Sequence, residues 1–303
     1  MSPAEQKFEK LKTLLQGYGS CLVAYSGGVD SVLLAHVAHK VLGERALAAI
    51  ADSPSLPRRE LQEALDLAAQ FKFPVRVLKT QEFDNQNYTA NPANRCYFCK
   101  HELFEELTPL AKAENFAVIA YGENASDIGD FRPGAQAAAE FQVRAPLKEA
   151  GLTKTEIREL SAQLGLPTAD KPQMACLSSR VPYGETVSPA KLSMIERAEY
   201  VLRDLGFYDV RVRHHALPIS NCQFPTEGGT GTANGSGKLA IGNSKLEMSI
   251  ARIELAPAEI PALLTNGKLA VVAEELKKIG YAHVTLDLQG YRRGSTNEVL
   301  GQK

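Results

Sequence analysis

Six consecutive residues near the start of the chain have the types and the order of a phosphate-binding turn. The sequence SGGVDS at positions 26–31 follows a short apolar run and precedes a segment with apolar residues at helical spacing. Adjacent glycines let the backbone aim several N–H groups at an anion, and the start of a helix adds partial positive charge. A carboxylate beside a polyphosphate requires a bridging cation, so Asp30 predicts a catalytic Mg²⁺ beside the phosphates. The residues expected to bind the polyphosphate here are Ser26, Gly27, Gly28, Asp30 and Ser31.

Three cysteines stand where thiol chemistry is possible. Cys96 and Cys99 open a predicted helix, where the positive terminus favours the thiolate, and Cys176 lies in a second loop. Three such thiols could hold three irons of a [4Fe-4S] cluster and leave the fourth iron open to carry a sulfide. A persulfide or sacrificial thiol, a zinc site completed by His101 or Cys222, and chemically inert cysteines stay open as alternatives.

The elements that must position these residues alternate between strand and helix. This order predicts a Rossmann-like α/β fold, in which a parallel sheet is covered by helices. Ligands of such sheets bind beyond the carboxyl ends of the strands, where the SGGVDS turn, Asp52 and the loop 122–134 fall. The expected strands are residues 21–26, 46–53, 75–80 and 116–122.

The second half of the chain has a different pattern of elements. We expect a domain of residues 1–182 and a smaller α+β domain of residues 183–303 with an antiparallel sheet. Residues 221–245 are rich in Gly, Ser, Thr and Asn, which predicts a mobile insertion. The expected elements of this half are helices 189–205 and 258–279 and strands 210–217, 249–255 and 283–290.

Composition excludes several classes of protein. The 34 basic and 35 acidic residues give a net charge of −1, which provides no general attraction to nucleic acid or to an anionic membrane. No apolar run approaches the roughly 18 residues of a membrane span, and the first residues lack the apolar core of a secretory signal. We therefore expect a cytoplasmic protein, in which five cysteines do not form a disulfide framework.

The SGGVDS turn in this setting resembles the PP-loop ATP pyrophosphatases. The resemblance implies attack on the α-phosphate, transfer of AMP to a substrate oxygen and loss of pyrophosphate. The Walker pattern of γ-phosphate transferases is absent, which agrees with this implication. The further nucleotide contacts that the resemblance implies are Asp52, Gly122, Asn124 and Asp127.

Three further segments extend a resemblance over nearly the whole chain. DFRPG at 130–134, CLSSRVPYG at 176–184 and LDLQGYRRG at 286–294 are similar to the LarE-type sulfur transferases of nickel-pincer nucleotide synthesis. The family implies that ATP adenylates a carboxylate of pyridinium-3,5-biscarboxylic acid mononucleotide and that sulfur then displaces AMP. Some members spend the cysteine that matches Cys176, which becomes dehydroalanine. Members with an added Cys-x-x-Cys, as in this chain, are associated with a [4Fe-4S] cluster, which implies that Cys176 is a cluster ligand.

The small nucleotide substrate needs residues that recognise its phosphate and carboxylates. Guanidinium groups suit both, although charge on a solvated strand is an equally simple interpretation of several of them. Glu199 resembles an active-site acid of the family, and its alternative is a surface helix residue. We expect a homo-oligomer and leave the sulfur donor open. The arginines expected to bind the substrate are Arg180, Arg211, Arg213, Arg252 and Arg292.

Three other functions share parts of this pattern. An enzyme that thiolates tRNA would also adenylate its substrate and use paired cysteines, but it would need a basic face. An ammonia-dependent synthetase would need none of the cysteines. A nucleotide sensor would bind ATP without releasing pyrophosphate.

Overall fold

The chain forms two compact units. The computed structural model describes residues 1–127, 133–172, 175–218, 247–265 and 267–292. The first unit comprises Met1–Glu196, and the second begins at Arg197. The domain boundary expected near residue 182 falls inside the first unit. The insertion expected at 221–245, Cys222 and most of the DFRPG segment lie outside the described residues.

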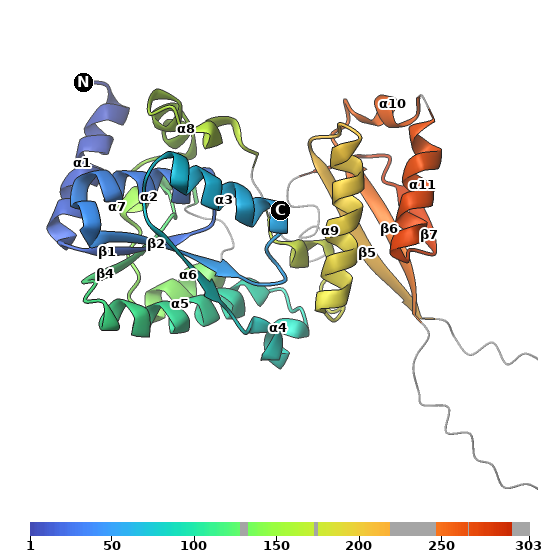
Figure 1. Cartoon of the computed structure of the whole chain (residues 1–303), viewed down its shortest axis with the longest axis horizontal. Helices are drawn as coiled ribbons and strands as arrows, with labels where there is room; N and C mark the ends of the chain where they lie inside the picture. Colours follow the sequence, from blue (N-terminus) through green and yellow to red (C-terminus); the bar gives the residue numbers. More distant parts are fainter. Residues whose placement is uncertain (128–132, 173–174, 219–246, 266, 293–303) are drawn as a thin grey trace, which may run out of the picture. The chain divides into compact units, whose positions relative to one another are not determined.

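Four parallel strands form the sheet of the first unit, which confirms the predicted α/β fold (Figure 1). The strands are β1 (Cys21–Tyr25), β2 (Ala46–Asp52), β3 (Val75–Lys79) and β4 (Val118–Tyr121). Their order is β3-β2-β1-β4, so β1 pairs with β2 on one side and with β4 on the other. β2 and β3 are therefore added on one side of β1, and β4 is added on the other. Parallel sheets of this kind bind ligands next to the point where the strand order reverses, which here lies between β1 and β4.

Helices cover both faces of this sheet (Figure 1). Alternate residues of β1 point to opposite layers, and all five are buried because the strand is central. One layer contains α1 (Pro3–Tyr18), α2 (Val29–Leu42), α3 (Arg58–Gln70), α7 (Pro146–Ala150) and α8 (Lys154–Gln163). The opposite layer contains α5 (Arg95–Ala113) and α6 (Pro133–Glu140), and the short α4 (Gln86–Thr89) precedes α5.

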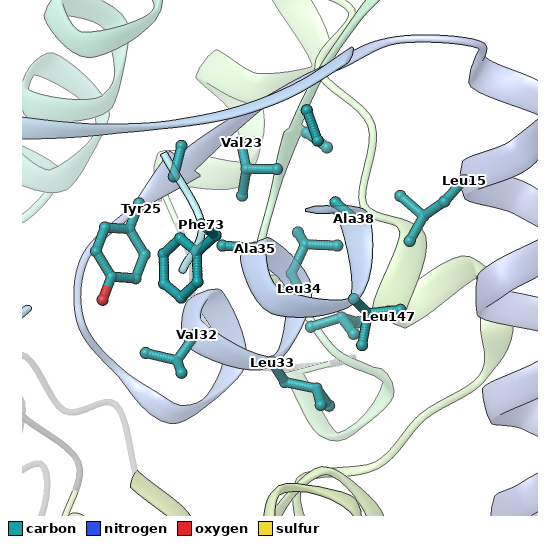
Figure 2. Packing of buried hydrophobic residues seen from close by; sticks show 14 of the residues in the cluster. Leu15, Val23, Tyr25, Val32, Leu33, Leu34, Ala35, Ala38, Phe73 and Leu147 are labelled. Carbon is teal, nitrogen blue, oxygen red and sulfur yellow. The ribbon is translucent and has the colours of Figure 1, made fainter. Parts of the chain in front are cut away.

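The first layer packs around α2, whose apolar side chains lie against β1 (Figure 2). Tyr25 meets Phe73 edge to face, with ring centroids 5.5 Å apart. Such a pair contributes about 0.5–1.5 kcal/mol beyond its buried area. The hydroxyl of Tyr25 donates to the carbonyl of Ala64 at 2.9 Å, so β1 is tied to α3 just before the SGGVDS turn.

The second unit contains a mixed three-stranded sheet. Its strands are β5 (Val210–Pro218), β6 (Glu247–Leu255) and β7 (His283–Leu286), in that order. β5 and β6 are antiparallel, but β6 and β7 are parallel, so the prediction of an antiparallel sheet is wrong for β7. The reason is that α11 (Lys268–Ile279) connects β6 to β7, and a helical crossover returns the chain in the same direction.

Two smaller differences from the expected elements concern helices. The helix expected over 258–279 is divided into α10 (Ile260–Leu263) and α11, and Gly267 adopts a φ of 72° between them. Helix α9 (Pro189–Asp204) agrees with its expected range. None of the helices in the described ranges is long and apolar enough to cross a membrane.

We expect Gly27→Ala to destabilise the first unit more than Gly19→Ala. Both glycines have φ near 72°, a conformation that costs an L-residue about 1–2 kcal/mol. A Cβ on Gly27 would lie only 2.8 Å from Cβ of Ala64, whereas nothing lies within 4 Å of one on Gly19. Overpacking should add about 1–3 kcal/mol at Gly27. Urea unfolding measures both losses, and equal losses would contradict the close contact with α3.

Candidate functional site

The turn between β1 and α2 is closed by its own serines. The hydroxyl of Ser31 accepts from the backbone N–H of Ser26 at 3.1 Å and donates to the carbonyl of Gly28 at 3.0 Å. The two serine hydroxyls lie 3.1 Å apart. Gly27 supplies the positive φ that the turn requires. The turn therefore has a fixed shape at the start of a helix, which is the geometry that binds anions.

Asp30 lies in the first turn of α2 between two partners from other elements. Its Oδ1 accepts from Nδ2 of Asn124 at 3.2 Å, and its Oδ2 forms an ion pair with Nζ of Lys154. Gly122 lies against the same turn, because a Cβ there would come within 3.0 Å of the backbone nitrogen of Ser31. The carboxyl end of β4 is thus packed directly on the phosphate-type turn.

The loop after β4 is held by hydrogen bonds within the loop. Oδ2 of Asp127 accepts from the backbone nitrogen of Asn124 at 3.1 Å, and Oδ1 of Asn124 accepts from that of Ser126 at 2.9 Å. These bonds orient the Asn124 amide toward Asp30. The structure thereby gathers most of the residues expected to contact the nucleotide, namely Ser26, Gly27, Gly28, Asp30, Ser31, Gly122, Asn124 and Asp127.

Asp52 ends the neighbouring strand β2 and forms an ion pair with Arg58. The same guanidinium donates to the carbonyls of Ser53 and Leu56, each at 2.6 Å. Arg58 therefore fixes the segment that follows β2. The nucleotide contact of Asp52 stays a prediction.

The cysteine pair lies on the first turns of α5. Helix α5 begins at Arg95, Cys96 is exposed, and Cys99 and Cys176 are partly exposed. Crowding by protein atoms, and after it the charge of Cys176, raises the pKa of both Cys96 and Cys99. This shift opposes the expected effect of the helix terminus, and the thiolate character of the pair stays a prediction.

The loop that carries Cys176 is held by bonds to its main chain. The backbone nitrogen of Leu177 donates to the carbonyl of Ser55 at 2.9 Å. The guanidinium of Arg180 is fully buried and donates to the carbonyls of Ala175 and Cys176 at 2.6 and 3.1 Å. Arg180 thus shapes the cysteine loop, and its contact with substrate stays a prediction.

Three cysteine sulfurs are the type of donor that a thiolate-bound group requires. The charge of Cys176 acts on both other thiols, that of Cys96 acts on Cys99, and the three are free of disulfides. Within the described ranges, no three His, Cys, Asp or Glu side chains are gathered as a group that could hold a single metal ion. His101, the possible fourth zinc ligand, lies 3.2 Å from a carboxylate oxygen of Glu105.

Most of the remaining candidate residues lie in the second unit and have protein partners. Arg213 forms two hydrogen bonds with Glu254, at 3.1 and 2.9 Å, and both residues are buried. Arg252 pairs with Glu254 at 3.0 Å. The buried Arg211 lies 4.7 Å from the ring centroid of Tyr291.

Glu199 and Arg292 differ in their surroundings. Glu199 is buried on α9 and accepts from the backbone nitrogen of Val212 at 3.0 Å. Arg292 is exposed and donates to the side chain of Gln289. The predicted roles of these two residues in the reaction stay predictions.

Known proteins resemble the chain over nearly its full length. An uncharacterized protein of Synechocystis sp. is 42% identical over 296 residues, which cover 98% of each chain. Pyridinium-3,5-bisthiocarboxylic acid mononucleotide synthase of Lactiplantibacillus plantarum is 30% identical over 301 residues, or 99% of this chain and 97% of that protein. The chain belongs to the LarE-type family of this synthase. No sequence model of a protein family matches this LarE-type chain.

A more distant similarity covers part of the LarE-type chain. One of the subunits of the glutamine-hydrolyzing GMP synthase of Archaeoglobus fulgidus is 24% identical over 212 residues, which are 63% of this chain and 67% of that protein.

Sequence reasoning missed Lys154 and Arg58, the ionic partners of Asp30 and Asp52 in this LarE-type chain. Lys154 is the first residue of α8, where a cation opposes the helix dipole. A lysine at that unfavourable position indicates that its charge is paired with a group outside its own helix. Arg58 carried a weaker signal, since it also begins a helix.

We expect Cys96 of the metal-free LarE-type protein to react with iodoacetamide with a midpoint pH above the ordinary value of about 8.5. A raised pKa means that less thiolate is present at neutral pH, so alkylation should be slow there and should accelerate as the pH rises. Cys176→Ala removes a charge that raises this pKa and should lower the midpoint. Peptide mass spectrometry follows the reaction, and an ordinary midpoint that Cys176→Ala leaves unchanged would contradict the coupling.

Proposed function

We propose that this protein is an ATP-dependent sulfur transferase that converts pyridinium-3,5-biscarboxylic acid mononucleotide into the bisthiocarboxylic acid. The observation that carries the proposal is the near full-length relation to a pyridinium-3,5-bisthiocarboxylic acid mononucleotide synthase. The site geometry supports it, because a rigid anion-binding turn and three free cysteines belong to one compact unit.

In the first step of the proposed reaction, a substrate carboxylate oxygen attacks the α-phosphorus of ATP. The bond to pyrophosphate breaks, and an acyl adenylate forms. The turn at 26–31 would bind the phosphates, and Asp30 would hold the bridging Mg²⁺. The placement of Asp30 supports this role, since its carboxylate already lies between two polar groups, Asn124 and Lys154. A cation that reached Asp30 would compete with Lys154, whose ammonium could then face the phosphates.

In the second step, sulfur forms a bond to the acyl carbon, and AMP leaves with the electron pair of the broken C–O bond. AMP is a far better leaving group than oxide, so adenylation makes the exchange feasible. Cys96, Cys99 and Cys176 would be the protein ligands of a [4Fe-4S] cluster. Such a cluster, when bound, offers an open iron that can carry sulfide. Each of the three thiolates would bind a different iron of the cluster.

The substrate phosphate and carboxylates would be recognised by arginine side chains. Arg252 and Arg292 are the more accessible candidates, because Arg252 is 40% exposed and Arg292 is exposed. Arg180, Arg211 and Arg213 are buried. They would affect substrate binding through the loop or strand that they hold, or they would give up a protein partner and bind the substrate instead. Glu199, also buried, would orient β5 through Val212.

We expect Asp30→Asn to reduce formation of AMP and pyrophosphate by at least about 100-fold, because the neutral amide holds the bridging cation much more weakly than the carboxylate does. The assay contains ATP, Mg²⁺ and the mononucleotide, and separates labelled AMP from ADP. Glu44→Gln, an exposed change at the opposite end of the sheet, is the control. Formation of ADP and orthophosphate by the unsubstituted protein would overturn the proposed reaction.

We expect anaerobically purified protein to contain iron and to keep Cys176 intact after several turnovers. Intact-mass measurement after reaction with the mononucleotide decides between catalysis and sacrifice. Loss of the mass of H₂S at Cys176, with one sulfur delivered per chain, would show that the thiol itself is the donor. Colourless protein with stoichiometric zinc would contradict the cluster.

A further inference from the structure

The loop after Cys176 is bound by a buried asparagine that precedes the Cys96 helix. Asn91 has no exposed surface and adopts a φ of 55°, a conformation that asparagine tolerates better than most residues. Its Nδ2 donates to the carbonyls of Val181 and Pro182 at 3.2 and 2.7 Å. Its own carbonyl accepts from the backbone nitrogen of Gly184 at 2.9 Å. One residue therefore holds three positions of the loop.

Arg95 joins this asparagine to the two cysteine-bearing elements. Its guanidinium is 4% exposed and donates to the carbonyl of Ser178 at 3.0 Å and to Oδ1 of Asn91. Arg95 immediately precedes Cys96 in the chain, and Ser178 stands two residues after Cys176. The guanidinium of Arg95 thus connects the helix that carries Cys96 to the loop that carries Cys176.

Tyr88 and Ser55 hold the same loop at a second point. The buried hydroxyl of Tyr88 lies 2.7 Å from that of Ser178. Ser55, whose carbonyl binds the nitrogen of Leu177, donates its hydroxyl to the buried carboxylate of Glu82 at 3.0 Å. These contacts fix the two residues that directly follow Cys176.

Such contacts restrict where the loop can lie. Each buried donor or acceptor would lose its partner if the loop moved, and a buried polar group without a partner is costly. The bonds join protein atoms only, so none of them waits for a metal, a nucleotide or a sulfur donor. The arrangement thus needs no bound group to complete its hydrogen bonds.

We propose that Asn91 and Arg95 are positioning residues of the thiol site, which clamp the Cys176 loop to the Cys96–Cys99 helix before anything binds. The chemical purpose of this clamp rests on the proposed function, but its existence does not. A preset site would receive a thiolate-bound group without the entropic cost of ordering the loop. Neither residue touches the reacting atoms in this proposal.

The test uses the reduced, metal-free full chain and the bifunctional thiol reagent dibromobimane, which becomes strongly fluorescent when it links two thiols. We expect it to link Cys176 to Cys96 or Cys99, as identified by peptide mass spectrometry. Asn91→Gly still permits the positive φ of this position and removes the side-chain hydrogen bonds. It should lower the rate of cross-linking at least about fivefold. Asn115→Gly, at an exposed asparagine with a φ of 58°, is the matched control and should leave the rate unchanged.

Monobromobimane, which reacts with one thiol at a time, separates positioning from reactivity. Its rate with Asn91→Gly should stay within about twofold of the unsubstituted protein, because each thiol is still present. Should Asn91→Gly fail to fold, Tyr88→Phe removes one hydroxyl from the clamp and should slow the link about twofold to threefold. A native linking rate in a folded clamp variant, or no link in the unsubstituted protein, would overturn the proposal.

Failure of the clamp is distinguishable from failure of the proposed function. Asn91→Gly should still release pyrophosphate with ATP and the mononucleotide but yield less thiolated product per pyrophosphate. Suppose that neither the unsubstituted protein nor any variant releases pyrophosphate, while the linking rates are as expected. The clamp would then be supported, and the proposed reaction would be wrong.

Discussion

A carboxylate at the start of a helix, held between an amide and an ammonium, is the interaction on which the candidate nucleotide site depends. Asp30 receives Asn124 from the loop after β4 and Lys154 from the start of α8. These three elements are far apart in sequence. The carboxylate holds their ends together beside β1 and β4, where the strand order of the sheet reverses. The negative charge suits the helix start, and the lysine is tolerated at its own helix start because Asp30 neutralises it.

Much of this arrangement follows from local sequence. The strands of the first unit and the turn at 26–31 were predictable, because apolar runs and paired glycines act over a few residues. Helix α1 also has a local signal in its sequence, the capping box of Ser2 and Glu5. The parallel pairing of β7 could have been inferred from the helix before it.

Other parts could not be predicted, because they depend on contacts between distant segments. No local pattern shows that Asn91 binds carbonyls about ninety residues further along the chain. The protonation of Cys96 is a similar case. Its place at a helix start favours the thiolate, whereas the surrounding protein atoms, which only the folded chain brings together, raise its pKa. The ionic partners of Arg213 and Arg252 likewise became visible only when β5 and β6 were paired.

The position of Glu199 has a consequence for association between molecules. Among the described residues β5 is an outer strand of its sheet, and the N–H of Val212, which could otherwise bond to another strand, is taken by the Glu199 carboxylate. An incoming polypeptide would have to displace a buried carboxylate before it could extend the sheet there. The side chain thus opposes strand addition at this one position of β5.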